Sequence, residues 1–457
     1  MNFRKAINVT ICTSMLLALA AGCGEKDESN LKTVQIWSGN SHSKVAVSKL
    51  VEGFNETRGK ELGVKVEYVV KGGESEQAIE LAYETGDEPE YCSSGSVQQL
   101  SEQGRIVAIN DLPGGEEFLA SFPKGSYDNF TYDGKTYKVP YGITPVGLVY
   151  NKDMFKKYGI VDENGEAKPP ETLAEMREYA KKMTNEAQQE YGFIIPLKTD
   201  WVYGVEVANI AAASSNHLTY DWAAGKYDFT THKPVYEFYQ GMKDDGSIFP
   251  GVINMDNDAA RAQFAMGKIA MKFGASYDVG VYNEQFPASC DWGVAPVPTV
   301  KKGERYRVPY SSTGCLMINK KAVDRLGEET AFEIFKWFHG DEVMAELYKE
   351  GMEIPCKPEI VNSVSIEDAK KGWVDFAGLV GMSYNDSWNV PKVVRSGELS
   401  ETKYFLNEFW SGNKTADEAV EYLTKSFNDG MQRWFEQNPD KKIEDYIIPD
   451  NNNIRIE

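Results

Sequence analysis

The chain has 457 residues, too many for one compact core, so two or three lobes are expected. Its formal net charge of −20 repels polyanions, which excludes nucleic acid and anionic lipid surfaces as partners. With 9 Trp, 25 Tyr and 21 Phe it has the aromatic content of a folded protein rather than of an acidic disordered chain.

The first 22 residues predict a secretory signal. Two cationic residues precede an apolar run over Val9–Ala21 that is too short to span a bilayer. Cys23 follows LAAG, which resembles the lipobox of bacterial lipoproteins, where a peptidase cuts before a cysteine that carries a diacylglycerol. Residues 23–30 then predict a flexible tether. We expect a protein anchored by lipid at Cys23 to the outer face of the bacterial cell membrane; an ordinary cleaved signal is the alternative.

The beginning of the mature chain alternates strand and helix. Thr33–Trp37 is a β-rich run, Val47–Phe54 has the apolar spacing of an amphipathic helix, and Val64–Val70 alternates as a strand. This βαβ unit predicts a parallel sheet with a right-handed crossover. The pattern repeats with a helix near Ser75–Thr85, a strand near Glu90–Cys92 and a helix near Val97–Gln103.

Ligands of open α/β sheets bind outside the carboxyl ends of the strands. The loops Trp37–Ser41 and Ser93–Ser96 follow two predicted strands and are therefore candidate crevice loops. Further along, Asp133-Gly134 between FTY and KTYKV predicts a hairpin turn. A strand over Gly147–Tyr150 and a helix in PPETLAEMREYAKKM, with proline at its start, follow.

The four cysteines outside the leader and the anchor are scattered and lack a CxxC spacing, which argues against zinc. An oxidising compartment permits a disulfide, but the sequence does not select a pairing. The few histidines form no HExxH and the chain has no GxSxG, so we expect neither metal nor cofactor. These cysteines are Cys92, Cys290, Cys315 and Cys356.

The passage Tyr132–Ile160 resembles the hallmark of extracellular solute-binding proteins of family 1. It contains the hairpin GKTYKVPY, then LVYNKDMF, then the helix start PPETLAE. The similarity continues in family order through FAMGKIAMKFGASY, WGVAPVPT, GCLMINKKAV and FWSGNKTADEAVEYLTKSFNDGM. The resemblance implies a monomeric lipid-tethered receptor, not an enzyme, that captures a carbohydrate for the permease subunits of an ABC importer.

The resemblance also implies the fold: a periplasmic-binding-protein-like α/β architecture of two lobes joined by a multi-segment hinge, with the ligand in the cleft. Hinge crossings are expected near Tyr141–Gly147 and Tyr310–Gly314, and a third between Pro358 and Trp388. Lobe one would comprise residues 31–141 and 314–361, and lobe two residues 144–308 and 362–457.

A sugar site needs flat aromatic faces over the C–H surface of a pyranose, and amides, carboxylates or hydroxyls for its hydroxyl groups. Such side chains occur at the crevice loops, the hinge crossings and the segments KTDWVYG, FGASYD and SYNDSW, with Trp201 as the preferred stacking ring. The predicted ligand-binding residues are Trp37, Asn40, Ser41, Ser94, Tyr141, Thr144, Trp201, Tyr277, Ser312, Asn385, Asp386 and Trp388.

Several candidates have a structural alternative. Trp37 could pack under the sheet edge, Asn40 and Ser41 could cap the following helix, which is the simpler interpretation, and Asp386 could cap another. Ser94 could lie in a plain solvent loop. The remaining tryptophans are predicted to pack in the core or on the surface: Trp222, Trp292, Trp337, Trp373, Trp410 and Trp434.

Two other classes of function remain open from the sequence. An acidic chain always offers two carboxylates that a lipid-anchored glycoside hydrolase would need. A receptor for another solute is the second class: a polyamine would want carboxylates beside aromatic rings, which SYNDSW supplies, whereas the chain lacks the adjacent tyrosines of iron receptors.

Overall fold

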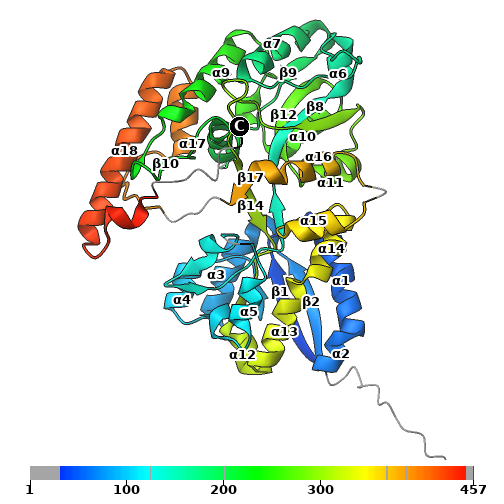
Figure 1. Ribbon diagram of the computed structural model, residues 1–457, viewed down its shortest axis with the longest axis vertical. Helices are drawn as coiled ribbons and strands as arrows, with labels where there is room; N and C mark the ends of the chain where they lie inside the picture. Colours follow the sequence, from blue (N-terminus) through cyan, green and yellow to red (C-terminus); the bar gives the residue numbers. More distant parts are fainter. Residues whose placement is uncertain are drawn as a thin grey trace, which may run out of the picture.

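The computed structural model describes residues 31–123, 125–199, 201–366, 369–385, 390–448 and 456. Two α/β lobes lie one above the other in Figure 1, with strands β14 and β17 between them. The blue, cyan and yellow segments build the lower lobe, here called lobe one, and the green and orange segments build lobe two. Cys23 and residues 1–30 lie outside the described residues.

Lobe one is built around a mostly parallel sheet in the order β2-β1-β3-β15-β4. β1 pairs in parallel with β2 and β3, which confirms the predicted βαβ unit, and β15 runs antiparallel to β3 and β4. The strands are β1 (Lys32–Ser38), β2 (Val64–Val70), β3 (Tyr91–Cys92), β4 (Ile106–Val107) and β15 (Met317–Asn319).

The helices that the sequence predicts near Val47–Phe54, Ser75–Thr85 and Val97–Gln103 are present in lobe one. In α1, Val47, Val51 and Phe54 are buried on one face. The helices are α1 (Lys44–Glu56), α2 (Arg58–Leu62), α3 (Ser75–Thr85), α4 (Val97–Glu102), α5 (Gly115–Ala120), α12 (Lys320–Leu326), α13 (Glu328–Phe338), α14 (Asp341–Lys349) and α15 (Pro358–Ser363).

The predicted hairpin is confirmed. β5 (Thr131–Tyr132) pairs antiparallel with β6 (Lys135–Thr136) across a two-residue turn. Both turn residues have positive φ, 50° at Asp133 and 73° at Gly134, as the tight hairpin turn that matches strand twist requires.

Lobe two contains the sheet β13-β8-β12-β9, in which β8 runs antiparallel to both of its neighbours and β9 parallel to β12. A small hairpin lies at its side. The strands are β8 (Val146–Asn151), β9 (Tyr191–Phe193), β12 (Ile269–Ala275) and β13 (Trp292–Ala295), and the hairpin strands are β10 (Tyr220–Asp221) and β11 (Lys226–Tyr227).

Helix α7 begins later than its prolines suggest. Thr172 and Glu175 form a reciprocal capping box, so the first helical residue is Leu173 and the two prolines lie before the cap. The helices of lobe two are α6 (Lys152–Lys157), α7 (Leu173–Met183), α8 (Asn209–Ala212), α9 (Lys233–Asp244), α10 (Asn257–Ala265), α11 (Asp278–Gly280), α16 (Trp373–Gly378), α17 (Glu401–Tyr404) and α18 (Ala416–Gln437).

A third sheet, β16-β7-β14-β17, lies where the lobes meet and forms the hinge. Its members are β7 (Gly142–Thr144), β14 (Val308–Thr313), β16 (Ile354–Pro355) and β17 (Ser383–Asn385). Gly314 follows β14 with a φ of 68°, and a Cβ there would lie 2.0 Å from the ring of Tyr141. The hinge therefore needs glycine at this position.

Two described residues near the C-terminus, Ile448 and Ile456, bond to lobe two. The amide of Ile448 donates to the carbonyl of Trp222 (2.9 Å), and that of Ile456 to the carbonyl of Arg305 (3.0 Å). Among the described residues, no helix combines the length and apolar character that crossing a bilayer demands.

Candidate functional site

Two cavities lie between the lobes. The first, about 600 Å³, is called the hinge cavity because it is walled by lobe one, lobe two and strand β14. The second, about 330 Å³, is called the loop cavity because the β1–α1 loop forms part of its wall. The residues of the hinge cavity are Asn129, Phe130, Trp201, Gly204, Val205, Asn209, Leu218, Pro309, Tyr310, Ser311 and Ser312.

The hinge cavity combines aromatic rings with neutral polar groups. Phe130 comes from lobe one, Trp201 from lobe two and Tyr310 from the hinge. The indole of Trp201 is 40% exposed, as a stacking face must be. Amides of Asn129 and Asn209 and two serine hydroxyls accompany the rings, and none of the described lining residues carries a charge. This is the side-chain chemistry that a neutral sugar requires.

The wall of the hinge cavity contains a π-helix, Gly204–Ala208. Gly204 and Val205 line the cavity, whereas Glu206 is fully buried behind them. The Tyr239 hydroxyl donates to the Glu206 carbonyl oxygen (2.7 Å). Burial raises the pKa of the Glu206 carboxyl to about 7, against an opposing effect from the positive charge of Lys272. π-Helical turns often occur at functional sites, and this one sets the wall beside Trp201.

The loop cavity brings together two predicted residues from different lobes. Ser41 lies on the β1–α1 loop, and Tyr277 follows β12 in lobe two. Burial raises the pKa of Tyr277, whose ring lies 5.2 Å from the guanidinium carbon of Arg261. His42, which the sequence analysis did not select, lines the same cavity, and its Nε2 lies 2.7 Å from Oε1 of Glu353.

The remaining residues of lobe one line neither cavity. The indole N–H of Trp37 donates to the Gln35 side chain, and the ammonium of Lys71 lies 3.8 Å from its ring centre. Ser94 is 8% exposed. Asn40 is half-buried, and its Nδ2 has no hydrogen-bond partner among the described residues.

The capping interpretation of Asn40 and Ser41 is wrong. The N-cap of α1 is Ser43, and its side chain makes no capping hydrogen bond. The loop is therefore two residues longer than the sequence suggested, which leaves Ser41 exposed at the cavity wall.

The predicted hinge residues lie at or under the hinge sheet. The Thr144 hydroxyl donates to the Ser311 carbonyl (3.1 Å), so it ties β7 to β14. Tyr141 is 1% exposed and packs on Phe338 with ring centroids 5.4 Å apart. The backbone of Asn385 pairs with Tyr310 in β17. The other two members of SYNDSW, Asp386 and Trp388, lie outside the described residues.

Sequence reasoning missed Phe130, Asn209, Tyr310, His42 and Glu353. Tyr310 could have been selected from the sequence, because it is the first residue of the predicted crossing YSSTG and has an aromatic side chain. Phe130 and Asn209 have no local pattern that separates them from core or loop residues. In the described part of the chain, no three His, Cys, Asp or Glu side chains gather to hold a metal, and all four cysteines are free thiols.

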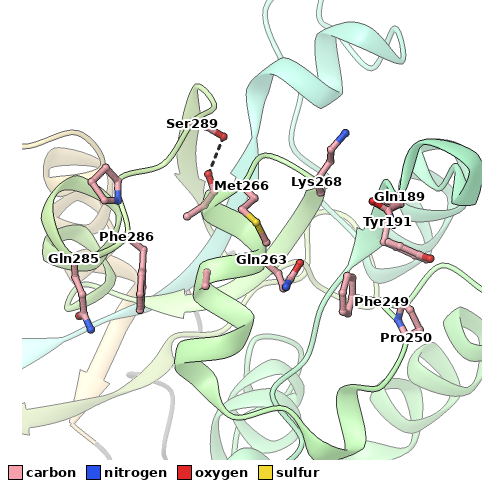
Figure 2. A pocket seen from close by; sticks show the side chains of 13 residues that line it. Gln189, Tyr191, Phe249, Pro250, Gln263, Met266, Lys268, Gln285, Phe286 and Ser289 are labelled. Atoms are coloured by element: carbon pink, nitrogen blue, oxygen red, sulfur yellow. Dashed lines mark hydrogen bonds between the residues drawn. The ribbon is translucent and has the colours of Figure 1, made fainter.

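A larger cavity, about 870 Å³, lies elsewhere. It is walled only by lobe two, and Figure 2 shows its rings Tyr191, Phe249 and Phe286 around Met266 and Gln263. It is called the lobe-two cavity below. Lys268, which precedes β12, marks the end of that strand far from the hinge, because the other end of β12 pairs with Val146.

Comparison with known proteins agrees with this geometry. The sequence profile of bacterial extracellular solute-binding proteins matches residues 49–372. The chain belongs to this family. The matched family is one of solute-binding proteins, and the relatives below carry names of binding proteins, which favours solute binding over the glycoside hydrolase alternative.

Relatives in sequence are distant. Binding proteins of Brucella abortus and Brucella suis are 28% identical over 200 residues, a match that spans 42% of this chain and 44% of theirs. The maltotriose-binding protein of Pyrococcus abyssi is 23% identical over 64% of this chain and 60% of its own. The sn-glycerol-3-phosphate-binding periplasmic protein UgpB of Brucella melitensis is 25% identical over 84% of this chain and 89% of its own.

Solved structures share the fold. The GacH receptor of Streptomyces glaucescens superimposes with a TM-score of 0.69 at 18% identity and covers 90% of this chain and all of its own. An ABC transporter solute-binding protein of Thermotoga lettingae, solved with α-D-tagatose, gives 0.68 at 18% identity over 88% of this chain and all of its own. The two-lobe α/β fold with a multi-strand hinge is thereby confirmed.

Proposed function

We propose that the protein captures a neutral carbohydrate, in particular an oligosaccharide, between its lobes and delivers it to the permease of an ABC importer. The observation that carries this proposal is the hinge cavity. Its rings Phe130, Trp201 and Tyr310 come from lobe one, lobe two and the hinge, and its polar groups are neutral amides and hydroxyls. A pyranose offers both apolar C–H faces and hydroxyl groups, so both kinds of side chain find partners on it.

The relatives support a sugar without fixing which one. One is named for maltotriose, and structures of similar fold were solved with tagatose, acarbose or raffinose. Others are named for sn-glycerol 3-phosphate. A phosphate would require a cation at the ligand, and the described lining of the hinge cavity has none, which favours the neutral sugar. A polyamine would require carboxylates there, and the described lining has none of these either.

Thermal denaturation with a panel of solutes tests the proposal. The panel contains maltotriose, raffinose, chitin oligosaccharides, tagatose, glycerol 3-phosphate, a polyamine and ferric iron. A solute at about 100 times its Kd adds roughly 2.7 kcal/mol to the stability of the folded state, which raises the melting temperature. We expect a neutral sugar to produce the shift. A response only to glycerol 3-phosphate, polyamine or iron would overturn the substrate class.

We further propose that lobe one (residues 31–141 and 314–361) and lobe two (144–308 and 362–457) move as units about the hinge sheet. The separate sheets on either side of β7 and β14 support this division. Small-angle scattering tests it: the radius of gyration should fall when the responding sugar is added, because a ligand that contacts both lobes favours the closed state. An unchanged radius at saturation would contradict the closure.

Finally, we propose that the mature chain is a monomer held by lipid at Cys23 on the outer face of the cell membrane, after removal of residues 1–22. The lipobox-like sequence and the membership in an extracellular family support this. Cys23→Ala should abolish lipid labelling and release the protein from the membrane fraction, because one residue carries the acyl anchor. Labelling that persists in this variant would refute the anchor.

A further inference from the structure

The carboxylate of Glu353 touches three segments that meet at the hinge. Its Oε1 lies 2.7 Å from Nε2 of His42 on the β1–α1 loop, and its Oε2 accepts a hydrogen bond from the Thr313 hydroxyl of β14 (2.7 Å). A Cβ on Gly142 of β7 would come within 2.8 Å of Oε2, so this strand also lies against the carboxylate. Glu353 is 2% exposed, so the loss of any of these partners would leave a buried charge less well compensated and would destabilise the folded protein.

Other polar side chains of the loop lie beside buried phenols. Asn40 and Ser43 lie beside the hydroxyl of Tyr141, and Ser43 also lies beside that of Tyr68. These groups are neutral, whereas the contact between His42 and Glu353 pairs an imidazole with a carboxylate and joins the loop to the hinge strands.

Charges on both lobes act on His42, whose side chain is 30% exposed at the loop cavity. Burial lowers the pKa of the imidazole, whereas the charge and the hydrogen bond of Glu353 raise it. Together the two effects of Glu353 outweigh burial, so the pKa of His42 lies above 6.5. Arg261 of lobe two opposes this, and it is itself paired with the buried Asp278 (2.7 Å).

The other titratable groups nearby are paired or protonated. Glu284 in the wall of the loop cavity pairs with Lys370 (2.7 Å), and Glu350, which follows α14, pairs with Lys49 of α1 (3.5 Å). Burial raises the pKa of Tyr68 to about 12, so this phenol is neutral in the physiological range. Glu353 is therefore the group whose charge favours the protonated imidazole.

We propose that Glu353 is a positioning residue that, through His42, holds the β1–α1 loop against the hinge strands, and that this hold depends on the protonation of His42. The imidazolium–carboxylate bond is charge-assisted and hence stronger than the neutral one. As the pH rises above 6.5 and passes the pKa of His42 in the folded protein, the charge is lost and the loop loosens. This inference rests on the proposed function in one respect, namely that the β1–α1 loop belongs to the ligand site.

A first experiment follows the His42 ring protons by NMR during a pH titration of the ligand-free protein. The titration midpoint should lie above 6.5 in the natural sequence and fall by about one pH unit or more in Glu353→Gln, because the variant keeps the buried site and Arg261 but loses the negative charge. Glu350→Gln is the matched control, since it removes an exposed carboxylate from the same end of α14 and should leave the midpoint unchanged. Equal midpoints in all three proteins would overturn the proposal.

A second experiment measures amide hydrogen exchange in the loop Gly39–Ser43. Protection factors should be about threefold or more lower near pH 8.5 than near pH 5.5 in the natural sequence, and independent of pH in His42→Gln. His42→Lys, which stays cationic, should keep the protection at the higher pH. If Glu353→Gln does not fold, the two His42 variants still decide the matter. Loop protection that is independent of pH in the natural sequence would overturn the proposal.

Both experiments use the ligand-free protein, so their failure leaves the proposed function intact. Conversely, a solute panel without any response would refute carbohydrate capture and leave the tie between Glu353 and His42 standing.

Discussion

The hinge cavity and the lobe-two cavity differ in a way that size does not reveal. The lobe-two cavity is larger, about 870 Å³ against about 600 Å³, yet all its walls belong to one lobe. A ligand there would contact the open and the closed protein equally and could not shift the balance between them. A ligand in the hinge cavity would touch both lobes and β14, so its binding free energy would also stabilise a closed state.

The two cavities are alike in most of their chemistry. In the lobe-two cavity the rings of Phe249 and Phe286 lie beside the amides of Gln263 and Gln285, and Lys268 adds a positive charge. The hinge cavity also surrounds its rings with amides and hydroxyls, but none of its described lining residues is charged. The comparison teaches that convergence of two lobes, rather than size or the mixture of side chains, identifies the site, and the following experiments can break or sharpen it.

The largest effect should come from a tryptophan in the core. Trp292 is 2% exposed in β13 and lies against Tyr282, with ring centroids 5.4 Å apart. Trp292→Ala should destabilise the protein by roughly 3–5 kcal/mol, because it opens a cavity where no ligand enters. Urea unfolding measures this. A loss below about 1 kcal/mol would mean that the wall of lobe two tolerates such a hole.

The next effect concerns Glu206 behind the wall of the hinge cavity. Its folded-state pKa of about 7 lies above the ordinary 4.5, so the folded state binds the proton more tightly than the unfolded state. Its contribution to stability is complete below pH 4.5 and is lost as the pH rises through 7, on the order of 3 kcal/mol in all.

Glu206→Gln, which removes this titration, should therefore gain stability relative to the natural sequence between pH 4.5 and pH 8. Chemical unfolding of both proteins across that range measures the difference. Glu436→Gln on exposed α18 is the control and should show no pH-dependent difference. A constant difference between Glu206→Gln and the natural sequence would place the ionised carboxylate in a better solvated environment.

A smaller and more selective effect is expected at Trp201. Its ring is 40% exposed in the hinge cavity, so Trp201→Ala should leave the melting temperature of the ligand-free protein nearly unchanged. Loss of the stacking face should weaken the binding of the responding sugar about tenfold or more. Calorimetric titration and thermal denaturation form the pair of measurements. A large drop in melting temperature would show that the ring supports the core instead.

The smallest effect is expected in the lobe-two cavity. Phe249→Ser and Phe286→Ser should leave sugar affinity within about twofold of the natural sequence, since neither ring lines a cavity between the lobes. The same calorimetric titration tests this. A tenfold loss of affinity in either variant would break the comparison, because it would couple the lobe-two cavity to ligand capture.

Much of the local structure could be predicted from the sequence. The spacing of Val47, Val51 and Phe54 predicted the buried face of α1, and Asp133-Gly134 predicted the turn of the β5–β6 hairpin. Trp201 and Ser312 were selected and do line one cavity, and Ser41 and Tyr277 line the other. Their roles in binding stay predictions, as do those of the other candidates.

By itself, the sequence determined the family, the alternation of strands and helices, and the kinds of side chain to seek at the crevice loops. It could do so because periodicity and turn chemistry act over a few residues, where backbone hydrogen bonding and burial are decided. Only the tertiary structure joined Glu353 to His42, 311 residues away, and brought Phe130 and Tyr310 into the same cavity as Trp201. Such contacts depend on the path of the whole chain through the hinge, which no local pattern encodes.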